Sequence, residues 1–127
     1  MELVERYDHR SGVHCGATAL QNVTAYYGLN YSEAACFGIG GGPAFVLYED
    51  PEAPWVRFRA SPTWLEQAFF ERLGISNLFR RGENFETAWA EVTARVDGND
   101  PVILFLDPAS LGYLHEAPPH LPRTSPC

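Results

Sequence analysis

The apolar segment PVILFL, Pro101 to Leu106, is the feature that most limits how this chain of 127 residues can fold. A continuous apolar run of this length is typical of a β-strand that is buried on both faces. Such a strand needs a neighbour on each side, and the upstream candidates are few and short: 44–48, 55–59 and 75–80. We therefore expect a small, incomplete sheet with this strand at its centre, and an open edge that favours a homo-oligomer.

Helical patterns occupy much of the chain before this segment. Cys15 to Tyr27 is apolar on most of its faces, which predicts a helix covered by other parts of the protein. Three further helices are predicted after residues that can cap a helix N-terminus: Ser32, Thr63 with Glu66 at capping-box spacing, and Asn84. We expect residues 1–106 to form one domain and the proline-rich residues 107–127 to form a tail.

Charge and composition exclude several classes of protein. The formal net charge is −7 and the basic residues number nine, all of them arginine, which argues against nucleic-acid binding and against a basic membrane-binding surface. An acidic protein of this kind attracts a cationic small molecule more readily. The charged opening MELVERYDHR does not resemble a signal peptide, no apolar run reaches membrane-spanning length, and three widely spaced cysteines fit reduced thiols. These features predict a cytoplasmic protein.

The stretch HCGATAL places Cys15 at the start of the first predicted helix. Unpaired N–H groups and the positive end of the helix dipole stabilise a thiolate at such a position, so Cys15 is a candidate nucleophile. Gly16 removes a side chain where an acyl group would have to approach. Cysteines at this kind of position are also common as packing residues, and we expect Cys36 to be one.

Three stretches together resemble the family of the butirosin biosynthesis protein H N-terminal domain: HRSGVHCGATALQNVTAYYGL, SEAACFGIGGG and NFETAWAEVTARVDGNDPVILFLD. The resemblance implies a papain-like α+β fold in which a central N-terminal helix packs on a small sheet. It also implies a cofactor-independent enzyme of antibiotic biosynthesis. In the family's namesake, a cysteine takes an acyl group from an acyl-carrier protein and passes it to an amine of an aminoglycoside. By this resemblance Cys15 aligns with the nucleophile.

The resemblance leaves the general base unassigned. The family's base histidine lies downstream in a glycine-histidine stretch that begins an apolar strand, and this sequence contains no such stretch. We therefore expect a chain that is truncated before that strand, with His115 and His120 as weak substitutes. His14 is adjacent to the cysteine and is a poor base by geometry, so we assign it an orienting function. His9, six residues before the cysteine, stands where papain-like enzymes often place an oxyanion-hole side chain, and the alternative is a partly exposed residue of an N-terminal loop.

Other candidate residues surround this motif. Gly40, Gly41 and Gly42 lack the spacing of a dinucleotide fingerprint, and they predict either a loop that approaches the substrate or a tight turn. Asp107 either attracts the cationic amine or caps the following turn. No paired metal-ligand spacing occurs, so we expect no metal. Four arginines are candidates for a surface that binds an acidic carrier protein, or are simply solvated surface residues: Arg57, Arg59, Arg80 and Arg81.

Three functions therefore remain open from the sequence. The first is a cysteine acyltransferase that uses a carrier-protein thioester and an amine. The second is a hydrolase of the same fold, a peptidase or thioesterase, in which water replaces the amine. The third is a noncatalytic remnant domain that keeps the fold without the base.

Overall fold

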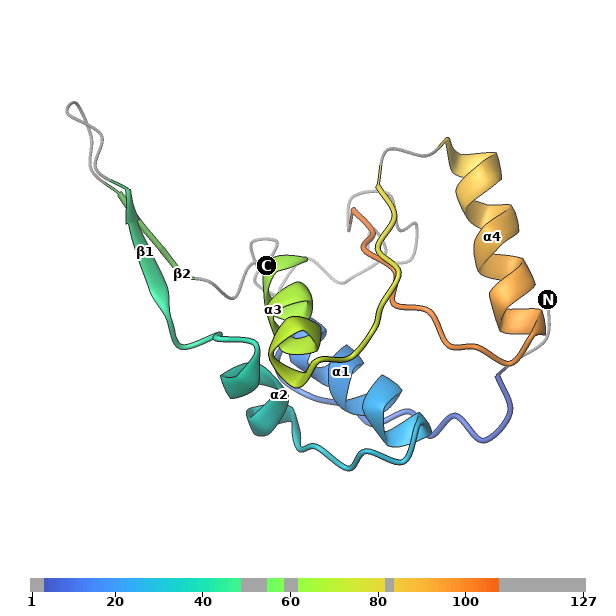
Figure 1. The fold of residues 1–127 in the computed structure, drawn as a ribbon, viewed down its shortest axis with the longest axis horizontal. Coiled ribbons are helices and arrows are strands. Elements are labelled where there is room, and N and C mark those ends of the chain that lie inside the picture. Colours follow the sequence, from blue (N-terminus) through green and yellow to red (C-terminus); the bar gives the residue numbers. More distant parts are fainter. Residues whose placement is uncertain (1–3, 49–54, 59–61, 82–83, 108–127) are drawn as a thin grey trace, which may run out of the picture.

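The computed structural model describes residues 4–48, 55–58, 62–81 and 84–107, with the side chains of 46–48 and 55–58 left out. In chain order its elements are α1 (Cys15–Tyr26), α2 (Glu33–Ile39), β1 (Phe45–Tyr48), β2 (Trp55–Phe58), α3 (Trp64–Leu73) and α4 (Phe85–Asp97) (Figure 1). Of the predicted tail only Asp107 is described, and His115 and His120 lie outside the described residues.

Helices α1, α2 and α3 pack against one another and form the core (Figure 1). The fully buried cluster at their centre consists of Ala17 and Leu20 from α1, Cys36 from α2, and Leu65 and Phe69 from α3. Burial of one leucine or phenylalanine side chain contributes about 1.5–3 kcal/mol to folding. This cluster therefore fixes the axis of α1, while its first residue remains at the surface. The predictions of a covered first helix and of a buried Cys36 are confirmed.

Local capping explains where most of the helices begin. His14 accepts a hydrogen bond from a backbone N–H in the first turn of α1, and Ser32 and Asn84 do the same for α2 and α4. Helix α3 differs, because its N-cap Thr63 has a positive φ of 75° and its side chain makes no capping bond. Only the Glu66 half of the predicted capping box forms, as its carboxyl accepts a hydrogen bond from the backbone N–H of Thr63.

The predicted papain-like α+β fold, with the first helix packed on a sheet, is wrong. In the described part of the chain the core is built from helices, and the only strand pairing is the antiparallel hairpin of β1 and β2. Its register runs from Phe45 opposite Phe58 to Tyr48 opposite Trp55. The hairpin projects away from the helices, and neither strand contacts one (Figure 1). It therefore supplies no surface on which α1 could pack.

The segment 101–107 is extended but is not a strand, which corrects the prediction of a central buried strand. Its first half is partly buried, and Ile103 packs against the helical core, whereas Leu104, Phe105 and Leu106 are exposed. The segment lies beside residues 75–80, with the rings of Phe79 and Phe105 5.9 Å apart. Residues 75–80 also form no strand. The physical reason is that the two remaining candidates, around β1 and β2, pair with each other.

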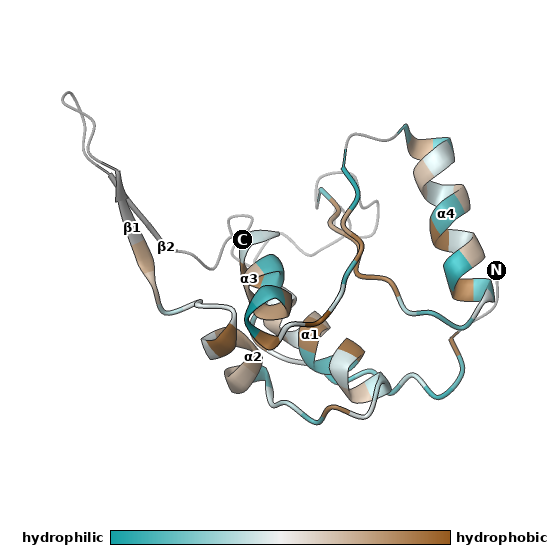
Figure 2. Cartoon of the chain, in the orientation of Figure 1, coloured by the Kyte–Doolittle hydropathy of each residue, from teal (hydrophilic) through white to brown (hydrophobic). Residues whose placement is uncertain are grey.

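Helix α4 stands apart from the other elements (Figure 1). It buries none of its residues, and the predicted apolar stripe leaves Phe85 and Trp89 exposed, with their rings stacked at 6.0 Å. Figure 2 shows apolar residues on α4 and in the 101–107 segment that lie away from the three-helix core. The turn after α4 is held at the end of α1, where the Tyr26 hydroxyl donates to the carbonyl of Asn99. None of the described helices is long and apolar enough to cross a membrane.

Candidate active site

Cys15 is the first residue of α1, and its side chain is exposed. The preceding residue, His14, has an extended backbone, so the chain enters the helix abruptly at this point. The first turn of a helix presents N–H groups that lack partners within the helix, and the dipole places partial positive charge there. Helix N-termini of this kind commonly lower the pKa of an exposed thiol and so favour the thiolate, which is the nucleophilic form.

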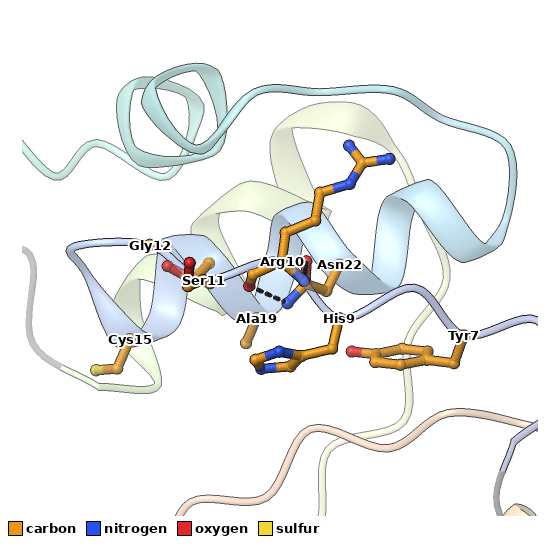
Figure 3. A pocket seen from close by; sticks show the side chains of 9 residues that line it. Tyr7, His9, Arg10, Ser11, Gly12, Cys15, Ala19 and Asn22 are labelled. Carbon is orange, nitrogen blue, oxygen red and sulfur yellow. Dashed lines mark hydrogen bonds between the residues drawn. The ribbon is translucent and has the colours of Figure 1, made fainter.

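A pocket of about 470 Å³ opens beside this thiol. It runs along one side of α1, with Cys15 at one end and Tyr7 at the other (Figure 3). The lining residues come from the segment before α1 and from α1 itself: Tyr7, His9, Arg10, Ser11, Gly12, Cys15, Thr18, Ala19 and Asn22. Burial raises the pKa of the Tyr7 phenol, which therefore stays a neutral hydrogen-bonding group at physiological pH. A pocket of this volume accommodates a small molecule.

Asn22 holds the segment before α1 in place against the helix. Its side chain is 3% exposed and uses both ends on one residue: Oδ1 accepts from the N–H of Arg10 at 3.2 Å, and Nδ2 donates to the Arg10 carbonyl at 3.0 Å (Figure 3). A buried amide with both ends paired fixes the backbone strongly. Both residues of this clamp line the pocket. It could not be predicted from the sequence, because Asn22 carries no local signal in a helical pattern.

Glu33 at the start of α2 fixes the start of α1. Its Oε1 accepts hydrogen bonds from the backbone N–H groups of Val13 at 2.8 Å and His14 at 2.7 Å, and from the Thr18 hydroxyl at 3.0 Å. The bond from the His14 N–H is the largest cause that lowers the pKa of this carboxyl. A Cβ on Gly12 would lie 2.8 Å from Oε1, so the arrangement also requires glycine there. The residue that precedes Cys15 is thus held by a carboxylate from another helix.

His14 is occupied by the helix rather than directed at the thiol. Its Nδ1 accepts the N–H of Ala17 at 3.2 Å, and its ring lies edge-on to Phe37, with the centroids 5.0 Å apart. An accepting Nδ1 carries no proton, so the neutral ring has its proton on Nε2. His14 therefore orients the start of α1. Its predicted function as an orienting group of the site stays a prediction.

The space beside Gly16 is filled by the carboxyl of Glu66. A Cβ built on Gly16 would lie 2.1 Å from Oε1 of Glu66. The Glu66 side chain is 5% exposed, and burial is the largest cause of its raised pKa. The sequence predicted that Gly16 leaves room for an acyl group, but in the structure a protein carboxyl occupies that room. The capping-box spacing was the signal that pointed to Glu66, though only as a helix cap.

The remaining predicted site residues are placed in different parts of the structure. His9 is exposed and lines the pocket with Cys15. The three glycines of the loop, residues 40–42, are buried, with Gly41 at a φ of 79°, and they do not line that pocket. This geometry is that of a tight turn, which was the alternative interpretation of the loop. Asp107 is exposed and also lies outside the pocket lining.

The predicted arginine surface is described only in part. Arg80 pairs with Glu91 at 3.8 Å, and the guanidinium of Arg81 lies 5.9 Å from the ring centroid of Phe79. The side chains of Arg57 and Arg59 lie outside the described residues. Among the histidine, cysteine, aspartate and glutamate side chains that are described, no three are grouped so as to hold a metal ion.

A family model described as butirosin biosynthesis protein H, N-terminal, matches residues 14–123. The match confirms the resemblance on which the sequence analysis relied. It begins at His14, so it covers Cys15, Glu33 and Glu66 but not the segment 7–12 that forms one wall of the pocket. Neither the curated proteins nor the solved structures yielded a match to this chain.

Proposed function

Because the chain belongs to the butirosin biosynthesis protein H N-terminal family, we propose that Cys15 transfers an acyl group from a thioester to an amine in antibiotic biosynthesis. The observation that carries this proposal is the exposed thiol at the first position of α1, beside a pocket of about 470 Å³. The thiol is accessible to a donor, and the helix dipole favours its reactive form.

The proposed reaction has two steps. The Cys15 thiolate attacks the carbonyl carbon of the donor thioester, the bond to the donor sulfur breaks, and the departing thiolate takes up a proton. The acceptor amine then attacks the carbonyl of the acyl-cysteine. A C–N bond forms, the C–S bond breaks, and the Cys15 thiolate leaves while the nitrogen loses a proton to the surrounding water. Over one cycle the donor thiolate takes up one proton, the amine nitrogen loses one, and Cys15 returns to its thiolate form.

Two partners follow from this proposal. The donor is an acyl-carrier protein that bears the acyl group as a thioester, and the acceptor is a cationic small molecule with a free amine. The net charge of −7 supports attraction of such an acceptor over long range. His9 is the side-chain donor that we propose for the oxyanion, because it lines the same pocket as Cys15. His14 and Glu33 position the thiol by holding the start of α1.

Intact-mass spectrometry tests the proposal. The protein is incubated with an acyl-carrier thioester and then with an excess of an aminoglycoside. We expect an acyl adduct that forms on the wild type and on the matched control Cys127→Ser but not on Cys15→Ser, and that the amine removes as an amide. Equal adducts on wild type and Cys15→Ser would remove Cys15 from the reaction. Loss of the adduct to water at a rate that no amine changes would instead identify a thioesterase.

A further inference from the structure

One buried carboxyl near the candidate nucleophile has no assigned function. Among the described residues, Oε2 of Glu66 is the buried side-chain oxygen that lacks a hydrogen-bond partner. Capping of α3 accounts for part of this carboxyl, because it accepts the backbone N–H of Thr63. It does not account for the second oxygen. An unpaired buried oxygen costs free energy, so it is expected where it has a use.

This carboxyl lies close to Cys15. Its Oε1 is 2.1 Å from the position that a Cβ would take on Gly16. Adding one Cα–Cβ bond and one Cα–Cα step places Oε1 within about 8 Å of the Cα of Cys15, and the further span from Cα to Sγ places the thiol within about 11 Å of Oε1. The carboxyl and the thiol therefore lie at the same end of α1, and the N-terminus of α3 reaches the same place. Two helix N-termini favour a negative charge there, whereas burial of the carboxyl opposes it.

We propose that the Glu66 carboxyl and the Cys15 thiol are electrostatically coupled, so that a negative charge on either one disfavours a negative charge on the other. At a separation of this size in a partly buried setting, Coulomb repulsion changes the ratio of thiolate to thiol about tenfold. Where both groups titrate, the pair then carries one negative charge in preference to two. Burial raises the pKa of Glu66 independently, in the same direction as the proposed repulsion, and keeps the carboxyl protonated to a higher pH than usual.

The other ionisable groups around Glu66 do not produce the same effect. On α1, His14 is the ionisable neighbour of Glu66, and its electrostatic influence lowers the pKa of Glu66 rather than raising it. On α2, Glu33 is held as a carboxylate by its hydrogen bonds, and burial raises the pKa of the Cys36 thiol to about 11, so neither changes its charge near neutral pH. On α3 itself, Glu71 is exposed and lies more than one turn further along the helix.

The coupling has a consequence that rests on the proposed acyl transfer. Acylation replaces the Cys15 thiolate by a neutral thioester, which favours ionisation of Glu66. A tenfold coupling releases at most about half a proton to solvent in this step. This release offsets part of the proton that the departing donor thiolate takes up, and Glu66 takes the same fraction back when the amine attacks and the thiolate returns. Glu66 is thus a positioning residue for charge, and it touches neither substrate.

The first test measures Cys15 directly. Alkylation by iodoacetamide is followed by mass against pH in a Cys127→Ser background, for the wild type, Glu66→Gln and the matched control Glu71→Gln. We expect Glu66→Gln to lower the pH midpoint of alkylation by about one pH unit, equal to about tenfold faster reaction below the midpoint. Glu71→Gln removes the same formal charge from an exposed position and should change the rate less than about twofold. Equal midpoints for Glu66→Gln and the wild type would overturn the proposal.

The second test measures how the charge at Cys15 changes the titration of Glu66, and it needs no substitution at Glu66. Cys15 is modified either with iodoacetate, which leaves a negative charge, or with iodoacetamide, which leaves a neutral group of similar size. The side-chain carboxyl of Glu66 is then titrated by ¹³C NMR and assigned through its own backbone. Because coupling is reciprocal, we expect its midpoint to be about one pH unit higher with the charged group. Identical midpoints would overturn the proposal even if Glu66→Gln failed to fold.

These two tests do not depend on acyl transfer. Shifted midpoints without an acyl adduct on Cys15 would refute the proposed function and leave the coupling intact. An adduct on Cys15 with unshifted midpoints would refute the coupling and leave the proposed function intact.

Discussion

Gly16→Ala probes the contact that places Glu66 next to the candidate nucleophile. The added methyl group would lie 2.1 Å from Oε1 of Glu66 and 3.3 Å from Cδ2 of Leu65. Both neighbours are buried, so neither can move aside freely. Overpacking of this kind costs about 1–3 kcal/mol, whereas alanine in place of glycine within a helix gains about 0.5–1 kcal/mol. We expect a net loss of about 1–2 kcal/mol in the free energy of unfolding.

The effect of Gly16→Ala on the free energy of unfolding should change sign once the Glu66 carboxyl is removed. In a Glu66→Ala background the closest overlap is gone, and Gly16→Ala should then be neutral or stabilising by up to about 1 kcal/mol. The measurement is urea unfolding followed by circular dichroism for both single variants and the double variant. This double-mutant cycle isolates the contact between residues 16 and 66 from the other effects of each change.

Gly38→Ala is the matched control, because Gly38 lies within α2 and a Cβ there would have no neighbour within 4 Å. We expect it to stabilise the protein by up to about 1 kcal/mol. If Gly16→Ala were as harmless as this control, or if its cost were the same with and without Glu66, the packing of Glu66 against α1 would be refuted.

Three further outcomes follow from the described contacts. Leu20→Ala should lower the free energy of unfolding in urea by about 2–5 kcal/mol, because Leu20 is fully buried in the core. Trp89→Ala on the unpacked α4 should change the free energy of unfolding by less than about 0.5 kcal/mol. Similar losses for the two variants would contradict the assigned core. Hydrogen bonds lower the pKa of Glu33 in the folded state from its ordinary value of 4.5. The stability that ionised Glu33 contributes is therefore present above pH 4.5 and is lost as the pH falls through the lowered pKa of the folded state. The temperature of thermal unfolding should therefore change less between pH 7 and pH 3 for Glu33→Gln than for the wild type. Asn22→Ala should speed amide hydrogen exchange at Arg10 by about tenfold or more, since it removes the acceptor of that N–H, and unchanged exchange would show that Asn22 does not hold the segment.

The positions of the helices could be predicted from the sequence because the signals are local. The cap residues Ser32 and Asn84 each accept an N–H three residues further along, and Gly74 ends α3 in the left-handed conformation. Interactions between residues three or four positions apart can be recognised from the residue types at that spacing in the sequence. Thr63 is the exception, because its backbone is held at a positive φ and its side chain is turned out of the capping position.

Pairing over longer distances could not be predicted in the same way. The apolar run 101–106 has the composition of a buried strand, yet it is not one, and Leu104 to Leu106 are exposed. A strand depends on backbone partners that are distant in the chain, and composition does not say which candidates will pair. The apolar stripe of α4 shows the same limit, since periodicity predicts a face that can be buried but not the surface that buries it.

For the candidate site, the sequence by itself determined the first position of a helix for Cys15 and a glycine after it. These features depend on neighbours within one helical turn. Only the tertiary structure decided that Glu33 holds the N–H of His14, that Asn22 clamps Arg10, and that the space beside Gly16 belongs to Glu66. A carboxylate or amide that bonds to another segment gives no periodic signal. Its function exists only after packing of α1, α2 and α3 brings separate parts of the chain within hydrogen-bond distance.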